Sequence, residues 1–310
     1  PLSRREMLLR TACGFGAFAF RGLRPAALQD GDFPSSLLGP AKRVLFLYMD
    51  GGVSQVDSFD PKPRLDAEHG QPIGMEVPKT QFDDVGTVLK SPWAFHPGGE
   101  SGIPVSDLFP NIRDRVDDLA VIRSMTSKFS EHSFANYFLH TGTGFQGRPS
   151  MGAWWSYGLG SENQNLPGYI VLDGGLIPPG GLDCFGSGFL PAEHQASVLQ
   201  SGGALLPNLG ATDSPDLQAR KLDLVRDLDG LGLVSGANVE ASIANQETAF
   251  RMQSALPRVA DLSGESATVR KMYGLESEFE PERTYGTQCL LARRLLEQGV
   301  RFVQLTCPSM

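Results

Sequence analysis

The strongest constraint on the fold is a short apolar run that ends in an aspartate and two glycines. Residues 44–49 read Val-Leu-Phe-Leu-Tyr-Met without a break, and Asp50, Gly51 and Gly52 follow. An unbroken run of β-forming residues that stops at a glycine pair is typical of a strand buried on both faces. The run therefore predicts a strand in the middle of a parallel sheet that is flanked by helices.

Acidic residues gather directly after this predicted strand. Asp50 stands at its carboxyl end, where open α/β sheets place their ligands, and Asp57 and Asp60 follow within one short loop. Carboxylate oxygens suit a divalent metal such as Zn, Ca or Mg, so Asp50 and Asp57 are candidate metal ligands. The alternative is an ordinary strand end followed by a polar turn, because an Asp-Pro pair often starts a turn.

Composition excludes two classes of partner. The chain has 310 residues and a formal net charge of -8, with 41% hydrophobic and 20% charged residues. No cluster of Lys and Arg follows the first 25 residues, so we expect no nucleic-acid partner. No stretch reaches the roughly 18 uninterrupted apolar residues of a membrane span, so we expect no stable span.

The first residues resemble an export signal. Arg4 and Arg5 precede a mostly apolar stretch over residues 9–20, a pattern typical of twin-arginine signal peptides. We expect a signal segment over residues 1–27, a linker over 28–41 and one partial domain over 42–310. The protein would then meet the twin-arginine export machinery and reside in the periplasm or outside the cell. The alternative is a basic N-terminal helix with an accidental arginine pair.

The rest of the chain alternates between predicted helices and strands, which indicates the α/β class. Long loop excursions are expected over residues 61–104 and 173–213, which are rich in Gly and Pro. Further strands are predicted at 119–122, 169–172 and 300–306. Helices are predicted from residue 106, at 132–140, around 154–157, from 215, and at 239–256, 266–273 and 284–298.

A second candidate site lies where a polar loop leads into the predicted helix at 132–140. Ser124, Thr126, Ser127 and Ser130 precede His132 and Ser133. Free backbone N–H groups and the positive end of the dipole allow a helix N-terminus to hold an anion. The alternative is that Ser130 or Ser133 caps the helix and His132 makes a structural hydrogen bond. His140 is interpreted as structural.

Several known active-site motifs are absent from the sequence. It contains no Gly-x-Ser-x-Gly elbow, no phosphate-binding Gly-x-x-x-x-Gly-Lys loop and no His-Glu-x-x-His zinc motif. A serine hydrolase of the α/β-hydrolase type, a P-loop enzyme and a zincin are therefore unsupported.

Taken together, the motifs resemble the bacterial domain-of-unknown-function family 1501. The resemblance covers nearly the whole chain. It rests on the leader and on residues 49–63, 122–125, 147–154, 157–160, 166–169, 188–192 and 299–304. That family is similar to the alkaline phosphatase and sulfatase superfamily, which implies a parallel-sheet core, a two-metal site and hydrolysis of phosphate or sulfate esters.

The resemblance assigns roles to single residues. It implies a metal at Asp50, and it puts His132, with Ser133 beside it, in the slot that holds the nucleophile in the superfamily. Arg148 is a candidate to bind the anionic group of the substrate, which would be a small-molecule or carbohydrate ester. His132 in that slot is a departure, because the superfamily uses Ser, Thr or modified Cys. His132 could act as a nucleophile or bind metal, or a metal-bound water could attack.

A second departure concerns the segments after the last predicted strand. The family continues there with Trp-Asp-x-His, Gly-Glu-Phe-Gly-Arg-Thr and Gly-Arg-Asp-His segments, none of which is present here. We therefore expect a C-terminally truncated fragment of an exported, metal-dependent, sulfatase-like hydrolase. The rival hypothesis is a non-catalytic periplasmic binding or structural protein on the same fold.

Overall fold

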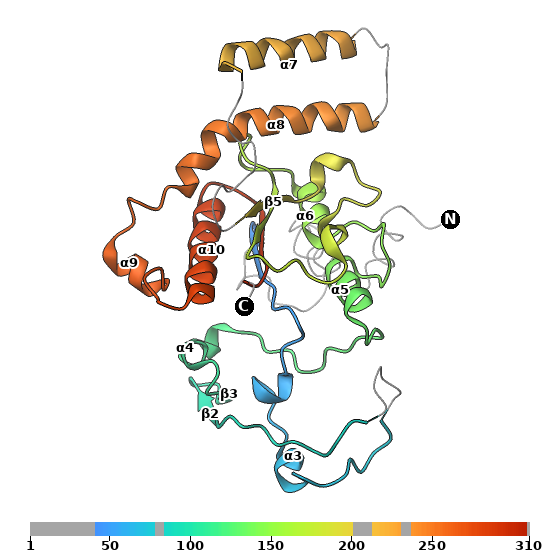
Figure 1. Ribbon diagram of the computed structural model, residues 1–310, viewed down its shortest axis with the longest axis vertical. Coiled ribbons are helices and arrows are strands. Elements are labelled where there is room, and N and C mark those ends of the chain that lie inside the picture. The colour runs from blue at the N-terminus through green and yellow to red at the C-terminus, as the bar shows by residue number, and fades with distance from the viewer. Residues whose placement is uncertain (1–40, 78–83, 201–212, 231–236, 309–310) are drawn as a thin grey trace, which may run out of the picture. The chain divides into compact units, whose positions relative to one another are not determined.

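The computed structural model describes residues 41–77, 84–200, 213–230 and 237–308 (Figure 1). The expected signal segment, and the expected linker except for its last residue, lie outside the described residues. The chain divides into two compact units. Among the described residues, the first comprises those of 41–49 and 131–308, and the second comprises those of 50–130.

A parallel sheet of four strands forms the centre of the first unit. Its order is β1 (Val44–Leu47), β6 (Phe302–Leu305), β4 (Tyr169–Asp173) and β5 (Ser197–Gln200). Each neighbouring pair is parallel, and Phe46, Gln304 and Val171 lie side by side in register. The sequence prediction of an α/β fold with a parallel sheet is confirmed.

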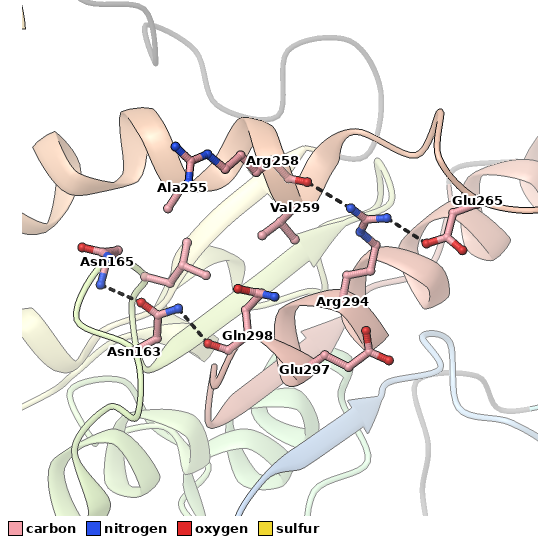
Figure 2. A pocket seen from close by; sticks show the side chains of 10 residues that line it. Asn163, Asn165, Ala255, Arg258, Val259, Glu265, Arg294, Glu297 and Gln298 are labelled. Carbon is pink, nitrogen blue, oxygen red and sulfur yellow. Dashed lines mark hydrogen bonds and ion pairs between the residues drawn. The ribbon is translucent and has the colours of Figure 1, made fainter.

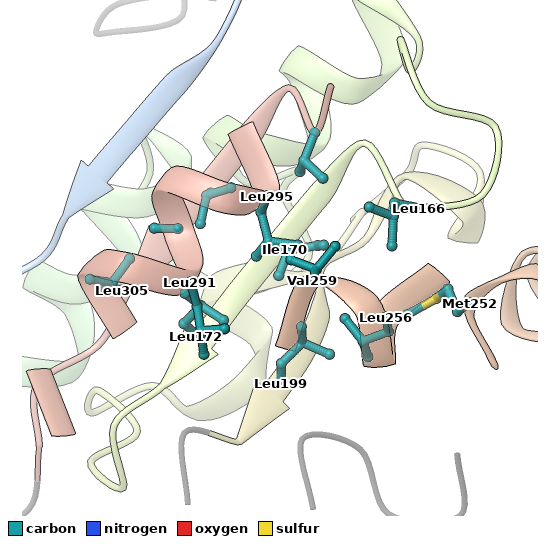
Figure 3. Packing of buried hydrophobic residues seen from close by; sticks show 13 residues of the cluster. Leu166, Ile170, Leu172, Leu199, Met252, Leu256, Val259, Leu291, Leu295 and Leu305 are labelled. Atoms are coloured by element: carbon teal, nitrogen blue, oxygen red, sulfur yellow. The ribbon is translucent and has the colours of Figure 1, made fainter. Parts of the chain in front are cut away.

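Two helices cover one face of this sheet. They are α8 (Ala237–Ala260) and α10 (Glu280–Glu297). Because strand side chains alternate between faces, Ile170 and Leu172 point the same way, and both pack in a cluster with Leu256 of α8 and Leu295 of α10 (Figure 3). Burying aliphatic side chains such as these contributes about 1.5–3 kcal/mol each.

Two other helices cover the opposite face. They are α5 (His132–Thr141) and α6 (Met151–Leu159). Tyr169 and Val171 of β4 pack there in a second cluster, with Tyr137 of α5 and Trp155 of α6. The sheet therefore lies between two layers of helices.

The remaining elements of the first unit follow the expected order along the chain. They are the short 3-10 helices η4 (Gly181–Phe185) and η5 (Ala192–His194) and the helices α7 (Pro215–Gly230) and α9 (Ala267–Met272). Pro215 opens α7, where a missing N–H costs nothing, and Ser266 caps α9 by accepting a hydrogen bond from the Val269 N–H. The predicted helices at 215, 239–256, 266–273 and 284–298 are confirmed.

The second unit contains the first of the two predicted loop excursions. An antiparallel pair of strands, β2 (Phe95–Gly98) and β3 (Ile103–Ser106), accompanies short helices. These helices are η2 (Gln55–Asp57), α3 (Pro63–Ala67), α4 (Pro110–Arg113) and η3 (Val116–Asp118). Val105 and Val116 are fully buried, and the rings of Phe59 and Phe109 stack with centroids 5.2 Å apart.

The prediction that residues 44–49 form a central strand buried on both faces is wrong for the sheet described. Here β1 is an edge strand, and Leu45 and Leu47 are 40% and 46% exposed. The central, doubly buried strands are β6 and β4. An apolar run indicates that a segment joins a sheet as a strand. Whether the strand is central or at an edge depends on its neighbours, which come from distant parts of the chain.

Three other local predictions are also corrected. Residues 119–122 form no strand, and Leu119 and Ile122 are exposed. The helix expected from residue 106 does not begin there, because Ser106 pairs within β3. Two short helices, α4 and η3, follow instead. Conversely, β5 lies inside the stretch 173–213, which was expected to contain only loops. Among the described residues, no helix is both long and apolar enough to cross a membrane.

Candidate functional site

Hydrogen bonds to the sheet fix the direction of α5. The amide of Gln304, which lies level with Phe46 on β1, is 2.8 Å from Nε2 of His140. Tyr48 lies two residues after Phe46, directly past the carboxyl end of β1, and donates a hydrogen bond to Oδ1 of Asn136. Moving from His140 back to Asn136 therefore means moving toward the carboxyl edge of the sheet. The N-terminus of α5, with His132 and Ser133, points to that edge.

His140 is part of the packing that holds α5. It is buried, and its ring lies against the rings of Phe46, Tyr48 and Phe185. Its Nδ1 lies 2.8 Å from the carbonyl oxygen of Asn136. A carbonyl only accepts, so we assign the hydrogen to Nδ1, and Nε2 then accepts from Gln304. This bonding agrees with a structural role for His140.

The first turn of α5 is capped by Glu131. Its carboxylate accepts a hydrogen bond from the Phe134 N–H at 3.1 Å, and hydrogen bonds from the backbone N–H groups of Ser133 and Phe134 hold the pKa of Glu131 below its usual value. The interpretation that Ser130 or Ser133 caps the helix is wrong. These N–H groups, which were expected to hold an anion, are bound to the protein's own carboxylate.

The start of α6 packs on the middle of the sheet. Gly152 packs against the ring tip of Tyr169, whose hydroxyl donates to Gln304 at 3.0 Å. Ser156, one turn later, lies against Gly168, before β4 begins. The helix therefore runs away from the carboxyl edge, and its N-terminal end, which Arg148 precedes in the sequence, is the end nearer to that edge.

The N-terminal ends of α5 and α6, at which His132 and Ser133 begin α5 and Arg148 precedes α6, thus point toward one edge on one face of the sheet. The two helices position these three residues, as the resemblance implies for a site at this edge. His132 and Arg148 are exposed and Ser133 is half-buried. Across residues 131–200, no hydrogen bond or ion pair joins Arg148 directly to either of the other two.

Asp50 and Asp57 belong to the second unit. Asp50 lies in the turn after β1, and Gly51 and Gly52 have φ angles of 76° and 74°, which favour glycine. Asp57 ends η2, and hydrogen bonds from the hydroxyls of Ser54 and Ser91 lower its pKa. A cavity of about 280 Å³ lies beside it and is lined in part by Val56 and Ser91.

The described residues do not supply a metal site. Over residues 41–77, 84–200, 213–230 and 237–308, no three side chains among His, Cys, Asp and Glu lie close enough together to share an ion. The Asp57 carboxylate already accepts hydrogen bonds from two serines, and Asp60 forms an ion pair with Lys62 at 2.7 Å. Asp50 stays a candidate ligand from the sequence, and among the described residues it belongs to no group of three possible metal ligands.

A second Asp-Gly-Gly sequence lies at the carboxyl edge and was missed by the sequence analysis. Asp173 is the last residue of β4, and Gly174 and Gly175 follow it, whereas Asp50, Gly51 and Gly52 come shortly after β1. The Asp173 carboxylate accepts hydrogen bonds from the Gly175 N–H at 2.8 Å and from the Thr306 hydroxyl, which follows β6, at 3.3 Å. A search for repeated strand–Asp–Gly–Gly patterns would have found it.

Gln288 of α10 also reaches this edge. It is fully buried, and its amide N–H groups donate to the carbonyls of Leu172 at 2.8 Å and Thr306 at 3.1 Å. Its Oε1 has no hydrogen-bond partner among the described residues. The ends of β4 and β6 are therefore joined by polar side chains from the helix layer.

The model of one protein family matches residues 41–309, with the description "Protein of unknown function (DUF1501)". The chain belongs to this family. No curated protein and no solved structure matches this DUF1501 chain. The family expected from the motifs is therefore confirmed, and the relation to alkaline phosphatases and sulfatases stays a prediction.

The DUF1501 chain also has a cavity at the opposite, amino edge of the sheet (Figure 2). It has a volume of about 380 Å³ and is lined by residues before β4 and β6, such as Asn163 and Gln298, together with Arg258, Glu265 and Arg294. Glu265 forms an ion pair with Arg294 at 2.8 Å, and Asn163 donates to the Gln298 carbonyl at 2.7 Å. Because ligands of open α/β sheets bind at the carboxyl edge, we do not assign the reaction to this cavity.

Proposed function

We propose that the chain is part of an exported, metal-dependent hydrolase of phosphate or sulfate esters. The observation that carries the proposal is the common direction of α5 and α6. Their N-terminal ends bring an imidazole, a hydroxyl and a guanidinium toward the carboxyl edge of a parallel sheet, which is the edge where such folds do chemistry.

Each of these groups suits one task in ester hydrolysis. The Arg148 guanidinium can bind two oxygens of a phosphate or sulfate group at once and offset the charge that develops there. The His132 imidazole can attack the phosphorus or sulfur atom, which breaks the bond to the alcohol oxygen, and water then releases phosphate or sulfate from the histidine. Alternatively, the imidazole can donate a proton to the leaving alcohol oxygen while water attacks. The Ser133 hydroxyl is the second candidate nucleophile.

Glu131 has a positioning role in this proposal. Its carboxylate interacts with the backbone N–H and the hydroxyl of Ser133, and its pKa is lowered chiefly by backbone hydrogen bonds. A carboxylate with a lowered pKa is a weak proton acceptor, so Glu131 is poorly suited to be the general base. It orients Ser133 instead.

Asp50 is the one residue to which this proposal assigns metal binding. A divalent ion would supply Lewis-acid stabilisation of the ester oxygens, and no step assigned above to His132, Ser133 or Arg148 runs through it. Export rests on the signal-like pattern in residues 1–27.

The test is turnover of p-nitrophenyl phosphate and p-nitrophenyl sulfate with Zn, Ca or Mg added. We expect one ester to be hydrolysed and His132→Ala to lower kcat by about 10²- to 10⁴-fold. The control is His69→Ala, which changes a histidine of the second unit and should leave kcat unchanged. Bound metal, measured by elemental analysis, should fall in Asp50→Asn. Turnover that is equal in wild type, His132→Ala and Asp50→Asn contradicts the proposal.

One observation favours a second candidate, a non-catalytic binding protein on the same fold. The Glu131 carboxylate occupies the helix N–H groups that an anionic substrate could use. On this account Glu131→Gln would bind inorganic phosphate or sulfate more tightly than wild type, with no turnover of either aryl ester. Turnover that requires His132 rejects the second candidate.

A further inference from the structure

Four rings form a continuous line of contacts on the side of α6 that faces away from the sheet. Centroids are 5.7 Å apart for Phe189 and Trp154, 6.3 Å for Trp154 and Tyr157, and 5.2 Å for Tyr157 and His194. We call these four residues the aromatic track. Phe189 and Tyr157 are 61% and 53% exposed, so the track is surface and not core.

Polar groups lie at both ends of the aromatic track. At one end the Arg148 guanidinium lies 5.9 Å above the centroid of the Phe189 ring. At the other end Nδ1 of His194 is 3.1 Å from the Ser156 hydroxyl, and Nε2 is 3.4 Å from the Glu193 carboxylate. Burial lowers the pKa of His194, so its imidazole is neutral near pH 7, and both of its ring nitrogens have a partner in the protein.

The size of the apolar surface limits what can cover it. A fully buried aromatic side chain removes about 150–250 Å² from water, so the exposed parts of Phe189, Trp154 and Tyr157 amount to roughly 300 Å². A stable protein dimer buries about 800 Å² per partner. The track alone is too small for a second copy of the chain, and its size is typical of a ligand-binding patch.

We propose that the aromatic track binds the carbohydrate part of an anionic carbohydrate ester. A sugar ring has an apolar C–H face that packs on aromatic rings, and its hydroxyl groups can donate to the exposed Glu193 carboxylate. Arg148 complements the charge of a sulfate or phosphate group. That the ligand is an ester follows only if the proposed function is correct. That a sugar chain binds is argued from the aromatic track alone.

The direction of α6 gives the bound chain a polarity. Arg148 precedes the N-terminal end of α6, which is the end nearer to the carboxyl edge, and Tyr157 lies toward its other end. A sugar chain along the track therefore presents its anionic group at the Arg148 end, toward His132 and Ser133. Neutral sugar units occupy the end at Tyr157 and His194.

The experiment is calorimetric titration of the full chain with hexasaccharides. The probes are a chondroitin sulfate hexasaccharide, its desulfated form and a neutral glucan hexasaccharide. We expect wild type to bind at least one of them, and Phe189→Ala and Tyr157→Ala each to weaken that binding about ten-fold, which corresponds to 1.4 kcal/mol. Arg148→Ala should weaken only the sulfated probe.

The matched control is Phe279→Ala. Phe279 is also 61% exposed, but it precedes α10, which packs on the other face of the sheet. This variant should bind like wild type, and circular dichroism checks that all variants are folded.

The proposal is overturned if no hexasaccharide binds at millimolar concentration, or if Phe189→Ala and Phe279→Ala bind equally well. It is also overturned if light scattering finds a dimer that Phe189→Ala dissociates, because a second copy then covers the track. Sugar binding without any aryl-ester turnover rejects the proposed function alone. Aryl-ester turnover without sugar binding rejects the aromatic track alone.

Discussion

The sequence Asp-Gly-Gly occurs at the carboxyl ends of two strands of the sheet, β1 and β4, but the two Asp-Gly-Gly turns have different surroundings. The first, β1, is an edge strand with alternate residues exposed, and the turn at Asp50, Gly51 and Gly52 has open space around both glycines. The second, β4, is buried on both faces, and Asp173 and Gly174 contact the residues that follow β6.

The comparison distinguishes two physical reasons why a position requires glycine. Gly51 has a positive φ angle, and a Cβ at that position would have nothing within 4 Å, so backbone conformation alone selects glycine there. Gly174 has no positive φ, but a Cβ at that position would lie 2.7 Å from backbone atoms of Cys307. A local sequence therefore does not reveal whether its glycine serves a turn or a close approach.

The largest expected effect is that of Gly174→Ala. Its methyl group would meet the Cys307 backbone, which cannot move without disturbing the end of β6, so we expect a loss of about 3 kcal/mol in the free energy of unfolding. Urea denaturation followed by circular dichroism measures it. A loss no larger than that of Gly51→Ala contradicts the distinction between the two turns.

Thr306→Val tests the polar side of the same region. Thr306 is fully buried, and its hydroxyl accepts from the Gly174 N–H at 3.0 Å and donates to Asp173. Its loss removes the acceptor of the Gly174 N–H and one of the hydrogen bonds that Asp173 accepts, at a cost of about 2 kcal/mol in unfolding free energy. Thr306→Ser keeps the hydroxyl and serves as the control, so a Ser variant as unstable as the Val variant would show that the methyl group matters instead.

Gly51→Ala should have a smaller effect, about 1 kcal/mol. Alanine is strained at positive φ, but the turn offers it space and alanine also restricts the unfolded chain, which offsets part of the strain. The same urea denaturation measures it. A larger loss than for Gly174→Ala would reverse the comparison.

The smallest effect concerns pH. The folded-state pKa of Glu131 lies below its unfolded value, so its stabilising hydrogen bonds are fully present above the unfolded pKa and are lost as pH falls through the folded one. Wild type should therefore exceed Glu131→Gln in stability at pH 7, and the two should converge in acid. A difference that is constant between pH 7 and pH 3 contradicts this assignment.

The sequence predicted the interior of the fold better than its edges. The apolar residues of β4 and β6 and the buried face of α10, with Leu291 and Leu295, follow from local patterns. The edge position of β1, and the strand β5 among turn-rich residues, depend on pairing between distant segments. Residues 119–122 show the reverse case, because a short apolar run without a strand partner stays exposed.

The candidate site was predicted only in part. His132 and Ser133 begin α5 as expected, because the strand–loop–helix pattern is local. Glu131 was missed as the cap, since Ser, Thr, Asp and Asn are the usual residues there. Asp173 and Gln288 were missed because their neighbours, Thr306 and Leu172, are distant in sequence.

The central claim is that the reaction takes place at the carboxyl edge of the sheet. Its most direct test compares this edge with the amino edge. Arg148 precedes the end of α6 that is nearer to the carboxyl edge, and Arg258 lines the cavity at the amino edge; both side chains are exposed. With whichever aryl ester the protein hydrolyses, Arg148→Ala should lower kcat/KM about 100-fold, whereas Arg258→Ala should leave it unchanged. A loss confined to Arg258→Ala would move the reaction to the amino edge and contradict the account.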